Sequence, residues 1–205
     1  MHLLTLSGGM PWQVVTAEQG VLLAQAVNEA GVEAHAAYPD RFVAAIELPI
    51  RDAGLALKEL DRVAGKPGLR AVHLPDSIEN RDYLFEPEFT PLLARCEELG
   101  YPIVFHNLNA DLFGKRPTAQ GLDNTFAHTV LAAKFITSGT LDKFPKLELV
   151  LPHAGGAFPY VAGRLEHFLY HMGATPERAT PFKEYLRRFH YDYRTYHPEW
   201  FRFLM

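Results

Sequence analysis

The sequence predicts an α/β fold built from repeated strand–helix units. Six short apolar runs, rich in aliphatic or aromatic side chains, alternate with longer amphipathic segments along the chain. From Leu3 in the first run to Phe189 in the last, the five steps average about 37 residues, which is typical of βα units. Strands joined by crossovers of this length are expected to be parallel.

Each apolar run is short enough to be a single strand. The predicted strands are residues 2–6, 42–48, 69–74, 102–106, 147–151 and 189–193. Between them lie helices with recognisable start and stop signals. In the first helix, Thr16 to Gln19 form a capping box before the apolar run 21–30, and Gly31 is the predicted stop. Asp52 caps the second predicted helix, and Gly65 ends it. The third covers residues 92–99, after Pro91 and before the stop at Gly100. The remaining predicted helices run from Asp123 or Asn124 through Ile136, over residues 158–171, over an inserted segment at 181–188, and from Glu199 onward.

Composition and charge narrow the classes of function. The 205 residues are 48% hydrophobic and 21% charged, ordinary values for a globular chain. The net charge of −4 gives no basic footprint for nucleic acid, and the apolar runs are too short to span a bilayer, so a small-molecule substrate is expected. The single cysteine, Cys96, rules out an intrachain disulfide and a multi-cysteine zinc site, and suits a reducing compartment. No linker-like stretch and no signal peptide are recognised, so one domain over residues 1–205 and a cytoplasmic location are expected.

Two architectures accommodate these parallel strands. A doubly wound sheet usually carries a G-x-G-x-x-G phosphate fingerprint after its first strand, and this sequence lacks it. A (β/α)8 barrel places its chemistry at the carboxyl ends of the strands. His106 and His153 lie at or just after the carboxyl ends of predicted strands, which favours the barrel.

Two histidines mark the carboxyl ends of predicted strands. His106 closes the fourth strand, where an imidazole can ligate a metal or transfer protons near neutral pH, or can simply be satisfied by a loop carbonyl. His153 follows the fifth strand and leads into Gly155 and Gly156. Paired glycines let a backbone approach a ligand or adopt positive φ, and the next helix presents its N-terminus to the same place. The alternative is that these glycines only turn a strand into a helix.

Two charged residues are candidates for contact with a substrate. Arg164, on the helix opened by that turn, can clamp a carboxylate bidentately, and a solvated helix arginine is an equally good interpretation. Asp192, at the end of the sixth strand, can orient a histidine or accept a proton, or can cap a loop.

Four other histidines carry weaker signals. His73 lies near the end of the third strand, but a shift of one residue in strand phase would point it into the helix layer. His128 is a candidate residue at the barrel mouth. His167 and His171 are better interpreted as a surface pair, because the Glu of H-E-x-x-H and a third ligand are missing.

The sequence resembles the amidohydrolase-2 family, in the branch of aminocarboxymuconate-semialdehyde decarboxylase and related benzoate decarboxylases. Residues 150–165, Val-Leu-Pro-His-Ala-Gly-Gly-Ala-Phe-Pro-Tyr-Val-Ala-Gly-Arg-Leu, resemble the strand-six segment of that family. Residues 39–42, 59–62, 102–106 and 138–147 resemble further family segments in the same order. The resemblance therefore covers nearly the whole chain.

The resemblance implies a metal-dependent (β/α)8 enzyme with a small carboxylate substrate. The family metal is usually zinc and sometimes manganese. In the family, the histidine matched by His106 is a metal ligand, and the histidine matched by His153 is an acid/base beside the metal. The arginine matched by Arg164 grips a substrate carboxylate across a dimer interface, so a dimer is implied. Asp192 is expected to join Arg164 at the substrate.

The chain also departs from the family pattern. No His-x-His pair occurs, and the sequence ends at Met205 before the family's last-strand Asp. The six predicted strands therefore correspond to barrel strands two to seven, so about six βα units are expected. Of four family metal ligands His106 alone is present, whereas catalytic zinc normally has three protein ligands. Weak or no stoichiometric metal is therefore expected.

Two functions follow as expectations. The first is the central part of a metal-dependent decarboxylase of a carboxylated aromatic or muconate-like acid, with hydrolysis of a C–N or C–O bond as the alternative reaction. The second is a non-catalytic remnant that acts as an interaction or structural protein, because open barrel edges need another chain to pair with.

Overall fold

The computed structural model describes residues 1–6, 10–79, 81–106, 117–172, 180–194, 197, 199 and 202, with the backbone alone at 117–120. The chain forms two units, Met1–Leu108 and Asn109–Met205. In both units the strands pair in parallel. The α/β class with parallel strands, predicted from the sequence, is therefore confirmed.

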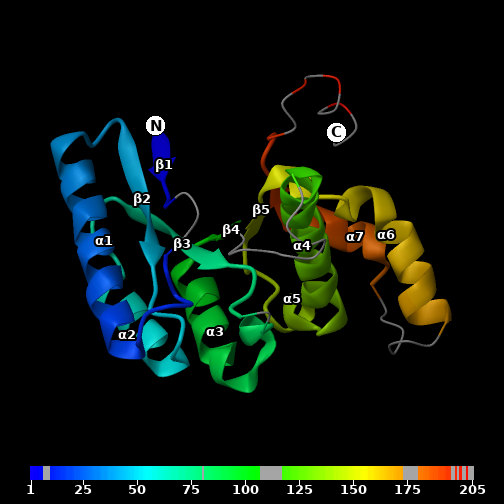
Figure 1. The fold of residues 1–205 in the computed structure, drawn as a ribbon, viewed down its shortest axis with the longest axis horizontal. Helices are drawn as coiled ribbons and strands as arrows, with labels where there is room; N and C mark the ends of the chain where they lie inside the picture. The colour runs from blue at the N-terminus through cyan, green and yellow to red at the C-terminus, as the bar shows by residue number, and fades with distance from the viewer. Residues whose placement is uncertain are drawn as a thin grey trace. The chain divides into compact units, whose positions relative to one another are not determined.

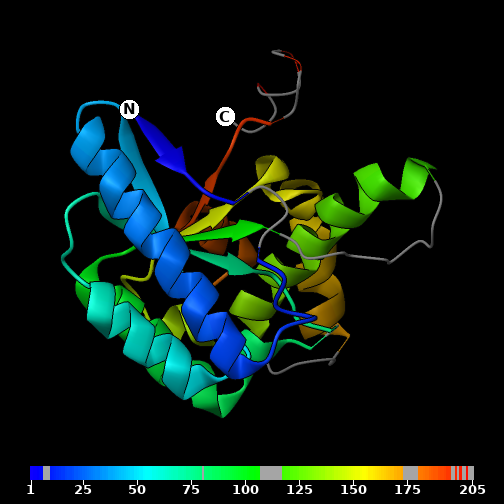
Figure 2. The ribbon, with the colours of Figure 1, turned by 60° about the vertical axis from the view of Figure 1, so that its left-hand side comes forward.

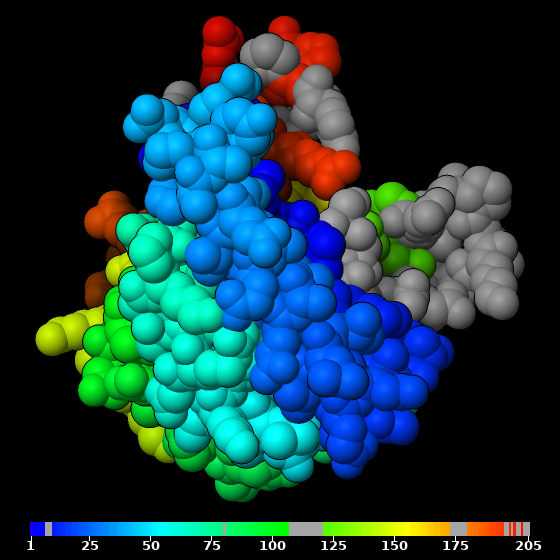
Figure 3. Space-filling view, turned by 90° about the vertical axis from the view of Figure 1, so that its left-hand side faces the viewer, coloured from blue at the N-terminus to red at the C-terminus, as the bar shows by residue number. Residues whose placement is uncertain are grey.

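The described part of the first unit alternates four strands with three α-helices. The elements are β1 (His2–Leu4), α1 (Ala17–Ala37), β2 (Phe42–Glu47), α2 (Ala53–Val63), β3 (Leu69–Pro75), the 3₁₀ turns Tyr83–Phe85 and Pro87–Phe89, α3 (Thr90–Leu99) and β4 (Ile103–His106). Strands β1 to β4 pair in sequence order. Helices α1 and α2 lie side by side along the strands (Figures 1 and 2) and form a continuous outer surface (Figure 3).

The local start signals of these helices are confirmed. The Thr16 hydroxyl accepts from the Gln19 backbone N–H at 3.2 Å, and the Gln19 side chain accepts from the Thr16 N–H at 2.9 Å, which completes the capping box. Asp52 accepts from the N–H of Leu55 at 2.8 Å and so caps α2. Gly100 ends α3 with a φ of 65°, the left-handed conformation that glycine adopts without strain.

The stop predicted at Gly31 is wrong. Helix α1 continues through Gly31 to Ala37. A Cβ added at Gly31 would lie 2.7 Å from the Cβ of Ala44 on β2. This glycine therefore allows close packing of helix and strand rather than ending the helix.

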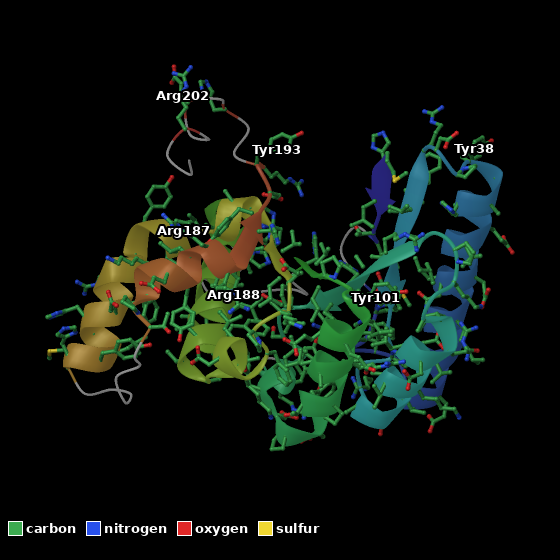
Figure 4. All side chains as sticks on the ribbon, turned by 180° about the vertical axis from the view of Figure 1, so that it is seen from behind. Tyr38, Tyr101, Arg187, Arg188, Tyr193 and Arg202 are labelled. Atoms are coloured by element: carbon green, nitrogen blue, oxygen red, sulfur yellow. The ribbon has the colours of Figure 1, made fainter. Side chains whose placement is uncertain are left out.

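The second unit places two strands among its helices. Its described elements are α4 (Pro117–Thr137), α5 (Thr140–Lys143), β5 (Leu149–Leu151), the 3₁₀ turn His153–Gly155, α6 (Phe158–Glu166), the π-helix His167–His171, α7 (Phe182–Tyr185), the 3₁₀ turn Leu186–Arg188 and β6 (Phe189–Tyr191). Tyr185 donates to Asp142 at 2.6 Å. Arg188, labelled in Figure 4, donates to the carbonyls of Leu141 and Phe144 at 3.2 and 3.3 Å. These bonds fasten the α7 segment to the α5 segment.

The predicted element boundaries need small corrections. The helix expected from Asp123 or Asn124 begins at Pro117, a residue suited to the first turn because its missing N–H has no role there. Five of the six strands are one or two residues shorter than predicted, and β3 is one residue longer. Most of the helix expected from Glu199 onward lies outside the described residues. Among the described helices, none is both long and apolar enough to cross a bilayer.

Candidate active site

The carboxyl ends of β2 and β3 carry a buried pair of ionisable side chains. Glu47 and His73 are register partners on these neighbouring strands, so their side chains project from the same face. The Glu47 carboxylate lies 2.6 Å from Nδ1 of His73, and the two residues are 1% and 3% exposed. Because burying a polar group costs free energy unless it is hydrogen-bonded, each side chain depends on the other.

The main chain of Glu47 is completed by a side chain from α1. Pairing between β1 and β2 ends at Ala44, so the strand leaves the backbone of Glu47 without a β1 partner. Buried Asn28 replaces that partner. Its amide donates to the Glu47 carbonyl at 2.9 Å, and its carbonyl oxygen accepts from the Glu47 N–H at 2.8 Å. Glu47 is therefore fixed at both its backbone and its carboxylate.

His106 ends β4, as predicted, and lies near this pair. Its ring centroid is 6.3 Å from that of His73. The neighbouring Tyr83 donates to the Pro75 carbonyl at 2.9 Å. Burial first, and then the charges of Asp76 and Glu47, hold the pKa of the Tyr83 phenol well above its usual value. We call Glu47, His73 and His106 the Glu47 cluster.

In the second unit, the turn after β5 has an unusual backbone. His153 and Ala154 have φ values of 54° and 56°, a region that non-glycine residues seldom adopt, and Gly155 and Gly156 follow at 72° and 66°. The positive φ predicted at the two glycines is confirmed, and it begins two residues earlier than predicted. We call residues 153–157 the His153 turn. Strain of this kind persists only where the surroundings fix it.

Three side chains hold the His153 turn. The Asp192 carboxylate accepts from the N–H of Ala154 at 2.8 Å, and the Thr129 hydroxyl accepts from the N–H of Ala157 at 2.9 Å. Nδ1 of His128 lies 3.2 Å from Nδ1 of His153. His128 and Thr129 both come from α4, which packs against the 3₁₀ turn His153–Gly155.

The turn also requires its glycines for space. A Cβ at Gly156 would lie 2.0 Å from the carbonyl oxygen of Thr125, and one at Gly155 would lie 2.5 Å from the ring of Tyr191. Real Cβ atoms essentially never make such approaches. The glycine pair therefore lets the turn contact α4 and β6 closely.

The predicted substrate residues lie in different settings within this unit. Arg164 lies on α6, the helix predicted to carry it, and its side chain is exposed. Asp192 directly follows β6 and bonds the backbone next to His153. The structure thus brings Asp192 to His153. A substrate role for Arg164 and Asp192 stays a prediction.

The described residues do not form a complete metal site. They contain no group of three or more His, Cys, Asp or Glu side chains arranged to hold an ion. His167 and His171 lie side by side on the π-helix with ring centroids 5.3 Å apart, both exposed, as expected of a surface pair. Since catalytic zinc normally takes three protein ligands, His106 would need donors beyond those described.

Sequence reasoning missed two residues of these clusters. Glu47 lay inside a predicted apolar strand, where its charge was the available signal, and Thr129 had no signal of its own. His73 and His128 carry weak signals in the sequence, and the structure gives each a buried imidazole in contact with another titratable side chain.

The sequence matches a family model. The model described as Amidohydrolase (Amidohydro_2) covers residues 7–199, nearly the whole chain.

Two curated relatives and one solved structure that the chain resembles are decarboxylases by name. The chain is 27% identical over 193 residues to a 2-amino-3-carboxymuconate-6-semialdehyde decarboxylase of Dictyostelium discoideum, covering 89% of this chain and 52% of that protein. It is 27% identical over 161 residues to a gamma-resorcylate decarboxylase of Rhizobium sp. (strain MTP-10005), covering 73% and 49%. A 5-carboxyvanillate decarboxylase structure from Novosphingobium aromaticivorans, complexed with manganese and a nitrobenzoic acid, superposes with a TM-score of 0.79 at 22% identity, covering 92% and 56%. The chain thus spans about half the length of the curated relatives it matches.

Proposed function

Because the chain belongs to the amidohydrolase family defined by this model, with its (β/α)8-type α/β fold of about six βα units, we propose that it takes part in metal-dependent, non-oxidative decarboxylation of a carboxylated aromatic or muconate-like acid. The observation that carries this proposal is the His153 turn, where an imidazole stands at the carboxyl end of a strand on a strained backbone with three side-chain anchors. The names of the related decarboxylases supply the substrate class.

The proposed reaction needs a proton donor. The bond between the carboxylate carbon and the substrate breaks, CO2 leaves, and the electron pair left on the substrate carbon forms a new bond to a proton. His153 is proposed to supply that proton, since an imidazole exchanges protons near neutral pH. Arg164 is proposed to bind the substrate carboxylate, and Asp192 to shape the substrate site through the turn. A dimer belongs to the same proposal.

The metal would bind at His106 together with donors outside the described residues. Zinc or manganese is proposed, and one of the similar structures contains manganese. The imidazole of His106 suits either ion.

The test is decarboxylation by the purified protein. Because the sequence predicts weak metal binding, manganese or zinc is supplied in excess. The chain is then mixed with gamma-resorcylate or 5-carboxyvanillate, and CO2 and the phenolic product are measured. Decarboxylation is expected, with a loss of about 100-fold or more in kcat for His153→Ala and little change for His190→Ala, which removes an exposed histidine on β6. Absence of CO2 and product with both acids and both metals would contradict the proposal. Cleavage of a C–N or C–O bond without CO2 would support the hydrolase alternative.

A further inference from the structure

His128 lies beneath the His153 turn with its ring directed at His153. It is fully buried at 0% exposure, whereas His153 is partly exposed. The two ring centroids are 5.1 Å apart with planes at 27°, and the Nδ1 atoms are 3.2 Å apart. Because the centroids are much farther apart than the Nδ1 atoms, the nitrogens face each other and the ring faces do not overlap. The contact has the geometry of a hydrogen bond between ring edges.

This contact couples the tautomers of the two histidines. A neutral imidazole carries one N–H and one acceptor nitrogen. Two facing Nδ1 atoms can form a hydrogen bond only if one of them carries a proton and the other does not. One ring is then the Nδ1–H tautomer and the other is the Nε2–H tautomer.

Burial makes His153 the donor when the pair carries a positive charge. Placing a positive charge on fully buried His128 is costly, so an additional proton on the pair goes to the partly exposed His153. An imidazolium has N–H on both nitrogens, so protonated His153 donates from Nδ1 to His128. The same bond forms with neutral His153 if its remaining proton stays on Nδ1. The proton is then gained and lost at Nε2 without rearranging the pair.

We propose that His128 is a positioning residue that holds His153 as the Nδ1–H tautomer and leaves Nε2 of His153 as the atom that exchanges the catalytic proton. The role in proton exchange rests on the proposed function, whereas the tautomer does not. Thr129, the next residue of α4, anchors the far end of the same turn through the N–H of Ala157. One helix thereby fixes both the main chain and the ring orientation of the candidate acid/base.

The direct test is long-range ¹H–¹⁵N NMR on the full chain labelled with ¹⁵N-histidine and without substrate. The His153 signal is assigned by its loss in His153→Gln, and that of His128 by its loss in His128→Phe. In the wild-type chain His153 is expected as Nδ1–H and His128 as Nε2–H. In His128→Phe, which keeps a buried ring but removes the acceptor, His153 is expected to shift toward Nε2–H. In His128→Asn, the amide oxygen can accept from Nδ1, so the Nδ1–H form should return.

Several outcomes would overturn the proposal: an Nε2–H form of His153 in the wild type, the same tautomer on both rings, or a His153 tautomer that is unchanged in His128→Phe. If His128→Phe does not fold, the wild-type spectrum and His128→Asn decide. Activity separates this inference from the proposed function. If the chain decarboxylates, His128→Phe should lower kcat about tenfold or more with KM within about twofold, and His128→Asn should recover part of it. If the chain decarboxylates nothing, the tautomers still stand or fall by the spectra.

Discussion

His73 and His153 are held by different kinds of partner. In the first unit, His73 contacts the carboxylate of Glu47, and both residues lie within regular, almost fully buried strands. In the second unit, His153 contacts the imidazole of fully buried His128 and stands partly exposed on a left-handed turn. An ionised carboxylate can only accept a hydrogen bond from an imidazole, whereas a second imidazole can either donate or accept one.

The two histidines therefore illustrate different roles: the partner of His73 stabilises the fold, whereas the partners of His153 position a candidate catalytic side chain. The Glu47–His73 pair is fixed by burial and by the Asn28 side chain, which bonds both main-chain groups of Glu47, so loss of the pair should lower the free energy of unfolding. The His153 turn holds strained backbone angles, which cost folding free energy and are typical of functional sites.

Glu47→Ala should give the largest loss of stability. It leaves buried His73 without its carboxylate partner, and breaking a buried pair typically costs about 3–5 kcal/mol of unfolding free energy. The loss is measured by the rate at which Cys96 is labelled in urea, because this single cysteine lies buried in the same unit as Glu47. Burial raises the pKa of its thiol to about 12, so the thiol is unreactive until the unit unfolds.

The matched control for this prediction is Glu148→Ala. Glu148 also contacts a histidine, His190, but both side chains are more than half exposed, so the expected loss is below about 1 kcal/mol. Equal losses in the two variants would show that burial does not distinguish the Glu47 pair.

Gly156→Ala should give the next largest loss, in the second unit. Its φ of 66° disfavours a side chain, and the new Cβ would meet the Thr125 carbonyl at 2.0 Å. A loss of about 3 kcal/mol is expected in urea unfolding followed by circular dichroism. Gly163→Ala on α6, where no atom lies within 4 Å of the added Cβ, should instead stabilise by up to about 1 kcal/mol. A Gly156→Ala chain as stable as Gly163→Ala would show that the turn is not strained.

Features that depend on residues close together in the chain were predictable from the sequence. The capping box at Thr16, the Asp52 cap and the alternation of apolar runs are local, and the structure confirms them. The sequence could not predict that α1 runs through Gly31. A glycine is needed there because of the contact with Ala44 on β2, and not because the helix ends.

The positions of His106 and His153 in the candidate site were predictable from the sequence, but the partners of the histidines in the two clusters were not. His106 and His153 stand at strand ends, which is visible in the sequence. The partners come from far along the chain: Glu47 is 26 residues from His73, and Asp192 is 38 residues from Ala154. The positive φ at His153 has no residue signal, because sequence patterns point to glycine for that conformation.

Asp192→Ala should have a smaller effect than either change above. It removes the acceptor of the N–H of Ala154, and a lost hydrogen bond to a charged group costs about 2 kcal/mol. Asp192→Asn keeps an oxygen acceptor and should lose about half as much. The unfolding free energies of the two variants measure this, and a greater loss in Asp192→Asn would contradict an acceptor role.

The smallest effect decides whether the His153 turn is one structural unit. Thr129→Val removes the hydroxyl that accepts from the N–H of Ala157, and Asp192→Ala removes the acceptor at Ala154, three residues earlier in the same turn. If one anchor is lost, the strained backbone can relax, so the second anchor then has less to hold. The two losses should therefore sum to more than the loss in the double variant, with a coupling of about 0.5–1 kcal/mol. Asp192→Ala combined with Glu47→Ala provides the contrast, since these residues share no partner and their losses should add. Additive losses for Thr129 and Asp192 would mean that the turn is fixed bond by bond, and the contrast between placement and stability would then lose its structural basis.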